Sequence, residues 1–451
     1  MKYDVIIAGA GMGGIGAAMY FARHTKLKVL LIEKEQQIGG TAITGGVNCF
    51  EPGISQNTML REIIADLIKM GKGRVQKTVR APNSELNCGI SADDPQSCYD
   101  DTLKRAGKPP QEWRRFMFEP SALLEVINSK LNKENVHILT SCELTDVTVE
   151  KKTIKSITVS HGGRKKVFEA DYFIDSTGDI VLARLAGCST WMGAESKAVY
   201  KELSAPENEE FSINGVSYMF RVSRKADKDC LEDNGVNIDK WLEKMENGAR
   251  VLTQLNYYPD GDISVNMLPT MTGDEYFVLD KEEADRICLK RVYAYWQYLK
   301  KNQELRLEEK GYHLSYVFPL RGIRESHRLV GKYVLTQNDL TTPVAEHPMR
   351  NRFIAYADHP MDTHGENSVQ AGVHQPYGIP YDCLLTNEID NMLVACRGAS
   401  FSHLASTSCR LSRTMLRLGE AAAIACQRSF ETGIELKNID ISRFAKCDIC
   451  N

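Results

Sequence analysis

The chain has 451 residues, of which 43% are hydrophobic and 25% charged, the balance of a globular protein with two or three domains or one large discontinuous domain. Its formal net charge of -3 excludes the strongly basic surface that nucleic acid or an anionic membrane attracts. No apolar run approaches the ~20 residues of a membrane span. The start of the chain leaves no room for a signal peptide, so we expect a cytoplasmic protein.

Three segments at the start of the chain predict a strand–helix–strand unit. Residues 3–8 (YDVIIA) form a short apolar run before a glycine, which is typical of a buried parallel strand. Residues 12–24 carry Ala, Met and Phe at helical spacing, and residues 28–33 (KVLLIE) form a second apolar run. The glycines of this unit lie at its first turn.

The spacing Gly9-x-Gly11-x-x-Gly14 at this turn indicates a dinucleotide-binding fingerprint. Gly9 permits the tight turn, Gly11 lets the backbone approach a pyrophosphate, and Gly14 allows close helix–strand packing. The N–H groups at the start of the helix then hold the phosphates. Glu33, at the end of the second strand, can accept hydrogen bonds from ribose hydroxyls. The alternative is a tight turn without a ligand.

The next part of the chain has two predicted helices separated by an irregular segment. Residues 58–70 predict an amphipathic helix, and residues 119–132 predict another, with Ser121 as its N-cap. Residues 76–118 are polar and loop-rich, and we interpret them as a surface excursion or lid. Residues 136–175 contain strand-like segments with short polar breaks, which favours hairpins.

The rest of the chain differs in composition, because it mixes strands with a long charged helix and a loop-rich stretch. The elements expected here are strands at residues 216–223, 262–268 and 391–396 and helices at residues 281–310 and 410–430. Thirteen scattered cysteines are expected to be free thiols, and several of them stand in apolar surroundings, where cysteine behaves as a small hydrophobic side chain.

Gly39-Gly40-Thr41, six residues after Glu33, resembles the segment of the glutathione-reductase-type FAD-binding fold that lies beside the flavin. Residues 174–179 (IDSTGD) and 391–397 (NMLVACR) are similar to two other segments of that fold. The stretches GGTAITGGVNCFEPG, GIRESHRLVGKYVLT, PMDTHG and IPYDCLLTNEIDNMLVACR resemble the bacterial FAD-dependent oxidoreductase family. This resemblance covers most of the chain.

The resemblance implies an α/β fold, with a Rossmann-like FAD-binding domain that contains a β-meander and a mixed α+β substrate domain. The FAD-binding domain is discontinuous and comprises residues 1–75, 119–190 and 381–435. Residues 191–380 form the substrate domain, and residues 436–451 form a C-terminal tail.

The resemblance also implies FAD as the cofactor and a set of cofactor residues. These are Gly9, Gly11, Gly13, Gly14, Glu33, Lys34, Gly40, Thr41, Ala42, Leu144, Gly178, Asp179, Arg397 and Arg410. The helix that starts near Arg410 would direct its N-terminus at the flavin pyrimidine ring, where it stabilises negative charge at N1–C2=O. The alternative for Arg410 and Arg413 is a solvated helix start.

Two polar clusters are candidates for catalysis. Asp362 and His364 lie in one loop, and a histidine beside a carboxylate can act as a general base; the alternative is a hydrogen-bonded structural loop. Arg324 could clamp a substrate carboxylate with its guanidinium fork; the alternative is an internal ion pair with Glu325. His403 is a weaker candidate.

Cys49 could contribute packing, a substrate contact or a nucleophile. Position 54 is Ile, so the redox dithiol of disulfide reductases is absent, and there is no second GxGxxG for a nicotinamide nucleotide. Cys447 and Cys450 at the C-terminus favour a frayed tail, with a mobile dithiol or a zinc site as alternatives; the zinc site would also need Cys88 and Cys98. We predict no metal site.

These patterns together predict an FAD-dependent oxidoreductase that transfers a hydride between a small polar organic substrate and flavin N5. The first alternative is a flavin reductase or monooxygenase that NADH or NADPH reduces. The second is an FAD electron-relay subunit that meets a partner protein. The charge and the motifs support neither nucleic-acid binding nor a membrane span.

Overall fold

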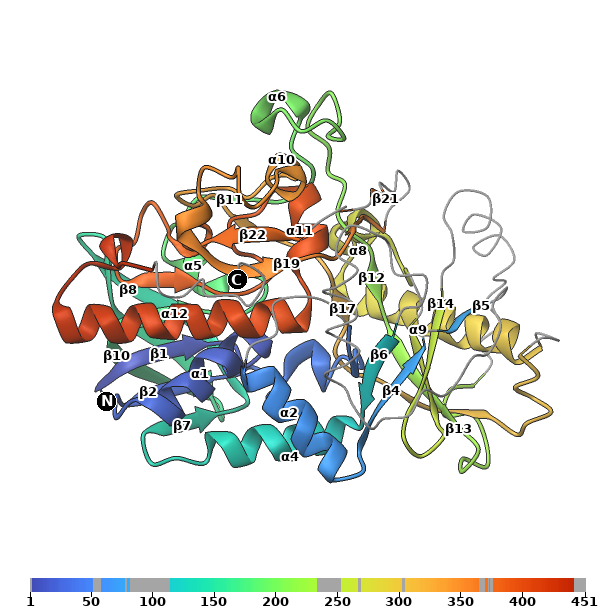
Figure 1. The fold of residues 1–451 in the computed structure, drawn as a ribbon. Helices are drawn as coiled ribbons and strands as arrows, with labels where there is room; N and C mark the ends of the chain where they lie inside the picture. Colours follow the sequence, from blue (N-terminus) through green and yellow to red (C-terminus); the bar gives the residue numbers. More distant parts are fainter. Residues whose placement is uncertain are drawn as a thin grey trace.

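The computed structural model is a mixed α/β structure (Figure 1). The described residues are 2–51, 58–77, 79–81, 114–232, 253–266, 269–301, 305–364, 370–371, 373 and 376–441. Most of the predicted lid at residues 76–118 lies outside them, as do all four cysteines of the zinc alternative. The nine cysteines within them are free, and eight of these nine are buried, as the sequence predicts.

The main sheet has the strand order β7-β2-β1-β10-β9-β8. A seventh strand, β23, pairs with the C-terminal end of β10, at residues that also pair with β1. The strands are β1 (Lys2–Ala8), β2 (Val29–Ile32), β7 (Val136–Leu139), β8 (Cys142–Glu150), β9 (Thr153–His161), β10 (Arg164–Asp175) and β23 (Met392–Val394). β7, β2, β1, β10 and β23 run parallel, whereas β8, β9 and β10 form an antiparallel meander. The predicted fold class is confirmed.

Two helices from opposite ends of the chain pack together on this sheet. α1 (Met12–His24) lies against α12 (Ser412–Thr432), which runs alongside β1 in Figure 1. The helices approach so closely that a Cβ on Gly419 would stand 1.8 Å from the carbonyl oxygen of Gly13. Only glycine fits at this crossing, so the glycine-rich turn and the C-terminal helix form one rigid unit.

A second sheet lies on the other side of the molecule, with the order β16-β13-β15-β14-β5. Its strands are β5 (Val79–Ala81), β13 (Met219–Ser223), β14 (Thr253–Tyr257), β15 (Ile263–Asn266) and β16 (His313–Val317). α9 (Lys281–Lys301) covers it and buries Trp296 against Phe220 and its neighbours. The prediction of a helix to residue 310 is wrong, because Arg306 and Gly311 adopt positive φ values of 51° and 72°.

A three-stranded sheet in the order β3-β6-β4 connects the two halves. It contains β3 (Cys49–Phe50), β4 (Gly73–Lys77) and β6 (Arg114–Phe118), and the neighbouring helices are α2 (Thr58–Lys69) and α4 (Pro120–Leu131). The Ser121 N-cap prediction is wrong, because Glu119 is the N-cap and Pro120 takes the first helical position. Proline favours that position, since its fixed φ suits the helix and its missing N–H costs no bond there.

The other elements are short. They are η1 (Gly40–Ala42), α5 (Val181–Leu185), β11 (Thr190–Trp191), α6 (Lys197–Tyr200), β12 (Val216–Ser217), α8 (Gly273–Val278), β17 (Gly322–Ile323), β18 (Arg328–Leu329), α10 (Gln337–Thr341), η2 (Arg350–Arg352), β19 (Phe353–Ala357), β20 (Met361–Asp362), β21 (Gln370–Ala371), β22 (Tyr377–Pro380), η3 (Tyr381–Leu384), α11 (His403–Cys409) and η4 (Leu436–Asn438).

The helix predicted at 410–430 is confirmed as α12, and a separate short helix, α11, ends just before it, with Arg410 and Leu411 between the two. Ser402 caps α11 by accepting a hydrogen bond from the N–H of Ala405. Within the described part of the chain, no helix has both the length and the apolar character that a bilayer crossing requires. The division into an FAD domain and a substrate domain stays a prediction.

Candidate active site

One large cavity of about 650 Å³ lies between the two sheets. The predicted cofactor residues that line it are Gly9, Gly11, Gly13, Glu33, Lys34, Gly40, Thr41, Leu144, Gly178, Asp179, Arg397 and Arg410. The predicted catalytic residues Cys49, Arg324, Asp362 and His364 line the same cavity. Gly14 and Ala42 are buried behind its wall. The structure thus brings together two sets of residues that are far apart in the sequence.

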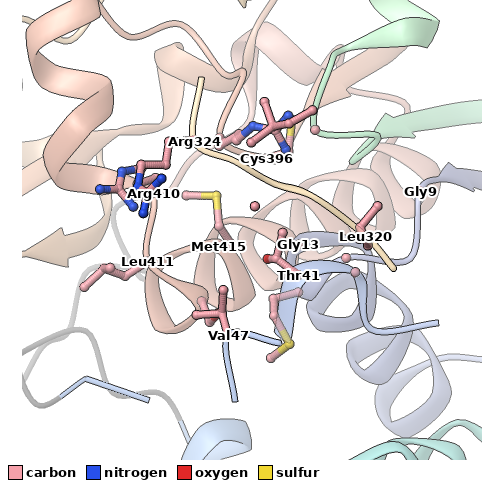
Figure 2. A pocket seen from close by; sticks show the side chains of 18 of the residues that line it. Gly9, Gly13, Thr41, Val47, Leu320, Arg324, Cys396, Arg410, Leu411 and Met415 are labelled. Carbon is pink, nitrogen blue, oxygen red and sulfur yellow. The ribbon is translucent and has the colours of Figure 1, made fainter. Parts of the chain in front are cut away.

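The glycine turn forms one end of the cavity (Figure 2). Gly9 has a φ of +91°, and a Cβ there would stand 2.4 Å from the carbonyl oxygen of Ser176. Gly11 is the N-cap of α1 and has no atom within 4 Å of the place where its Cβ would stand. No side chain of the described residues caps this helix, so its first N–H groups and its positive dipole end remain open to an anion.

Glu33 lies at the carboxyl end of β2, beside the glycine turn. Its carboxylate accepts hydrogen bonds from the N–H of Ala10 at 2.7 Å and from the N–H of Glu35 at 3.0 Å. A carboxylate offers about four acceptor positions, so about two remain for hydroxyl groups of a ligand. Glu33 is therefore held in a fixed orientation and can still bind a diol.

The segment after β10 forms another wall of the cavity. Asp175 holds it in shape by accepting hydrogen bonds from the N–H groups of Thr177 and Ala183. Asp179 accepts from Arg397 at 2.6 Å and from the hydroxyl of Ser326 at 2.7 Å. Burial opposes ionisation of Asp179, but Arg397 and Ser326 outweigh it and lower the pKa of this carboxyl. The carboxylate therefore fixes the arginine at the cavity wall.

At the opposite end, the Nε2 atom of His364 lies 2.9 Å from Oδ2 of Asp362. Burial and the neighbouring Arg324 lower the pKa of His364 to about 4, against the opposing effect of Asp362. The histidine is thus neutral at pH 7. Because Asp362 is ionised and accepts from Nε2–H, the geometry assigns the free lone pair of the ring to Nδ1.

Asn214 holds the backbone around this pair. Its Oδ1 accepts from the N–H of His364 at 3.0 Å, and its own N–H donates to Oε2 of Glu325 at 3.0 Å. The N–H of Gly215 donates to the carbonyl of His364 at 2.8 Å. The Asp362–His364 loop is therefore fastened to two other segments of the chain. Sequence reasoning missed Asn214, because no local pattern marks it.

Arg324 reaches the cavity from the strand segment after β17. One Nη atom donates to the carbonyl of Gly215 at 2.7 Å and to the hydroxyl of Ser217 at 3.0 Å. The alternative of an ion pair with Glu325 is wrong. Glu325 instead lies 2.9 Å from Arg328 and 2.9 Å from His403, because successive side chains of an extended segment point to opposite sides. This buried pairing also accounts for His403.

Arg410 lies between α11 and α12 and lines the cavity, and its Nε has no hydrogen-bond partner among the described residues. Figure 2 shows its guanidinium and that of Arg324 gathered at one end of the pocket, away from Gly9. Burial and the nearby Arg410 lower the pKa of Arg324 to about 9. For Arg413 the solvated-helix alternative is wrong, because this side chain is buried and pairs with Asp358, whereas Arg410 is half-buried.

Cys49 is buried in a small cluster with Met117 and Tyr258 and also lines the cavity. Burial raises the pKa of its thiol to about 11, although Arg115 nearby acts in the other direction. The sulfur is therefore protonated at neutral pH, which favours packing or a ligand contact over nucleophilic attack. The alternative that Cys49 is a nucleophile stays a prediction, and the protonated thiol does not support it.

Sequence reasoning missed three further residues of the cavity wall. Arg115 of β6 forms an ion pair with Glu51, whose other carboxylate oxygen lies 3.6 Å from Nε2 of His359. The Nδ1 of His359 contacts the carbonyl of Pro360 at 2.7 Å, and burial lowers the pKa of this histidine. Of these three residues, only His359 could have been found from the sequence, because it lies in the same polar loop as Asp362. The pairing of β3 with β6 brings the others together.

A metal site needs several His, Cys, Asp or Glu side chains around one point. Among the residues that the structure describes, no group of three or more His, Cys, Asp or Glu side chains could hold a metal ion. The CDIC tail and its alternatives lie beyond the described residues, so they stay predictions.

The parallel sheet with a glycine turn at its first strand defines a class of nucleotide-binding flavoproteins. The family model described as FAD dependent oxidoreductase matches residues 4–447, so the chain belongs to this family of flavoenzymes and uses FAD. The predicted family, cofactor and enzyme class are confirmed.

Two curated relatives are named soluble pyridine nucleotide transhydrogenase. The protein from Hahella chejuensis is 33% identical over 81 residues, which are 18% of this chain and 16% of that protein. The protein from Colwellia psychrerythraea is 30% identical over 164 residues, which are 36% of this chain and 31% of that protein. Both matches thus span less than a third of the relative's length.

Two solved structures are similar in fold. One is a geranylgeranyl bacteriochlorophyll reductase-like protein from Thermoplasma acidophilum, with a TM-score of 0.50 and 13% identity over 96% of this chain and 79% of that one. The other is a flavin-dependent brominase, with a TM-score of 0.50 and 14% identity over 97% of this chain and 81% of that one. At these identities the likeness shows the fold alone.

The residues of the cavity fit FAD. Gly11 leaves open space at an uncapped helix N-terminus, as a pyrophosphate requires, and Glu33 keeps acceptor capacity for a ribose. The Nε atoms of Arg397 and Arg410 have no partner among the described residues, although both are buried donors. The cavity volume also lies within the ~300–1,000 Å³ typical of cofactor sites. The individual cofactor contacts stay predictions.

Proposed function

We propose that this flavoenzyme transfers a hydride between a small polar organic substrate and N5 of FAD, and that His364 and Asp362 handle the accompanying proton. The observation that carries this proposal is the 2.9 Å contact of the two side chains in the wall of the cavity that also contains the glycine turn. This support is strengthened by Arg324 and Arg410, whose charges act on His364 and which line the same cavity as Gly9, Asp362 and His364.

Bound FAD supplies the hydride acceptor. The protein residues supply the rest of the chemistry. As a C–H bond of the substrate loses its hydride, the O–H or N–H group on the same carbon loses its proton to Nδ1 of His364. Asp362 keeps Nε2 protonated and stabilises the imidazolium that forms. A neutral histidine is the form that can accept the proton, and the low pKa of His364 ensures that form at pH 7.

The test is anaerobic reduction of the oxidised holoenzyme by a panel of small hydroxy and amino compounds, followed at the flavin band near ~450 nm. With an active compound in hand, His364→Ala should keep its FAD and lose about 100- to 10,000-fold in the rate of flavin reduction. His24→Ala is the matched control, because this histidine is exposed on α1. A His364→Ala variant with full FAD and full rate would remove the assignment.

A second candidate function is reduction of the flavin by NADH or NADPH, followed by reaction with another acceptor or with oxygen. Its support is the name of the two curated relatives, which are pyridine nucleotide transhydrogenases. Anaerobic mixing with NADH and with NADPH separates the two functions. Rapid bleaching by either nucleotide supports the second, whereas an unchanged flavin band supports the first. The electron-relay alternative, with a partner protein, stays a prediction.

A further inference from the structure

The described residues at the end of the cavity near His364 contain more positive charge than their carboxylates match. Neither Arg324 nor Arg410 forms an ion pair with any described residue, and Arg324 is only 8% exposed. Arg324 donates to one carbonyl and one hydroxyl, both neutral. Two neighbouring guanidinium groups in a buried place repel each other, which is unfavourable unless an anion joins them.

The nearby carboxylates are already engaged elsewhere. Glu51 pairs with Arg115, and Asp358 pairs with Arg413. Asp362 is a further negative charge at this end, and one of its contacts is with the neutral His364. Even if Asp362 is counted fully against the two arginines, which have no ion-pair partner among the described residues, one positive charge is left over. The charges of the wall therefore call for one more anionic group inside the cavity.

We propose that the substrate carries a carboxylate, which binds between Arg324 and Arg410. This inference rests on the proposed hydride transfer and specifies its substrate class. A guanidinium presents parallel N–H donors that match the two oxygens of a carboxylate, and such charged hydrogen bonds are the strong ones. The clamp lies beside His364, so it would place the carbon next to the carboxylate within reach of the proton acceptor. The substrate class is thus a small carboxylate with an oxidisable group near its carboxyl carbon.

The clamp also acts on the proton acceptor. The charged groups that face His364 are Arg324, Arg410 and Asp362, and both arginines lower its pKa. A bound carboxylate neutralises part of their charge and so raises the pKa of His364. The histidine therefore becomes a stronger base only when the substrate is present.

The experiment measures ligand binding to the oxidised holoenzyme through flavin difference spectra. The probes are two pairs of equal shape, propionate with propionamide and benzoate with benzamide. A carboxylate of at least one pair should bind at least about 10-fold more tightly than its amide. Arg324→Gln should weaken binding of the carboxylate by about 10- to 100-fold and should change the affinity for the amide by less than about 2-fold. Arg324→Lys keeps the charge but loses the paired N–H donors, so its affinity for the carboxylate should lie between those of the unaltered protein and Arg324→Gln.

Arg410→Gln is an independent variant on a different segment, and it should weaken the carboxylate in the same way. The proposal is overturned if neither carboxylate binds up to about 50 mM, or if acid and amide bind equally. It is also overturned if Arg410→Gln shifts only the flavin reduction potential, because that arginine then serves the flavin alone. If the arginine variants do not retain FAD, the acid–amide comparison in the unaltered protein decides.

This test does not depend on turnover. A carboxylate that binds through the arginines but never bleaches the flavin supports the clamp and contradicts the hydride transfer. If a neutral alcohol bleaches the flavin and no carboxylate is preferred, the hydride transfer is supported and the clamp is contradicted.

Discussion

The two ends of the cavity are built in different ways. We call the end near Gly9 the nucleotide end and the end near Arg324 the substrate end, after the ligands proposed for them. The nucleotide end depends on backbone N–H groups of one glycine turn and on Glu33, all within residues 1–33. The substrate end depends on side chains from five separate segments, including Cys49, Arg115, Arg324, His364 and Arg410. The first is a local motif that sequence patterns reveal. The second is assembled by tertiary contacts, and its charges are only partly paired.

The largest expected effect is at the nucleotide end. Gly11→Val should reduce FAD affinity by at least about 100-fold, because the valine side chain occupies the space where the backbone meets the pyrophosphate. The substitution leaves the backbone unstrained, since Gly11 is extended, with a φ of -69°, and no atom lies within 4 Å of its Cβ position. Flavin content per chain is the measurement. Gly11→Ala should lose less, and full flavin content in Gly11→Val would contradict the role of this turn.

At the substrate end, Asn214→Ala should lower turnover by about 10- to 100-fold while FAD stays bound, because the loop of Asp362 and His364 loses its anchor. Asn214 is a positioning residue, so raising the substrate concentration should not restore kcat. The matched control is Asn135→Ala, which also removes side-chain bonds to backbone but lies beside α1, far from the substrate end. Equal losses of turnover in both variants would show a merely structural effect.

The third prediction concerns pH. Burial lowers the pKa of His364 from its ordinary 6.5 to about 4, so the unfolded chain binds this proton more readily than the folded one. Stability is therefore full above pH 6.5 and falls as the pH drops toward 4, by up to about 3 kcal/mol from this group. The lowered pKa of His359 acts in the same direction and also begins below pH 6.5, whereas the lowered pKa of Asp362 adds a further loss of stability only below its unfolded value of 3.8. Urea unfolding at several pH values should show a shallower loss in His364→Gln; an unchanged slope would contradict the assignment.

The smallest effect is expected at Cys49. Cys49→Ser should change turnover by less than about 3-fold and stability by about 1 kcal/mol, because the buried thiol is protonated and packs against Met117 and Tyr258. Steady-state kinetics and thermal unfolding give both values. A loss of activity of more than 100-fold would restore the nucleophile alternative.

The same contrast decides what the sequence could predict. The strand–glycine–helix unit is predicted correctly, because its chemistry lies within one local segment. The partner of Arg324 is not, since adjacency to Glu325 suggests a pair that the extended backbone forbids. The pairing of Glu51 with Arg115 depends on β3 meeting β6, and no periodicity within either segment contains that information.

Helix boundaries show a similar limit. The alanine-rich pattern at 410–430 correctly predicts one helix, α12, whereas the pattern at 281–310 predicts a helix that continues past the observed end of α9 at Lys301. The sequence analysis did not predict α11 (His403–Cys409), because seven residues are too few to show a clear helical periodicity.

That packing has a consequence for biosynthesis. The chain enters the FAD fold at its first strand, yet β23 and α12, which complete the sheet and the helix layer, come from residues 392–432. A nascent chain on the ribosome therefore carries an unfinished nucleotide site for most of its synthesis. We therefore expect FAD to bind tightly only after residues 392–432 have been synthesised, and its binding then to stabilise the folded state.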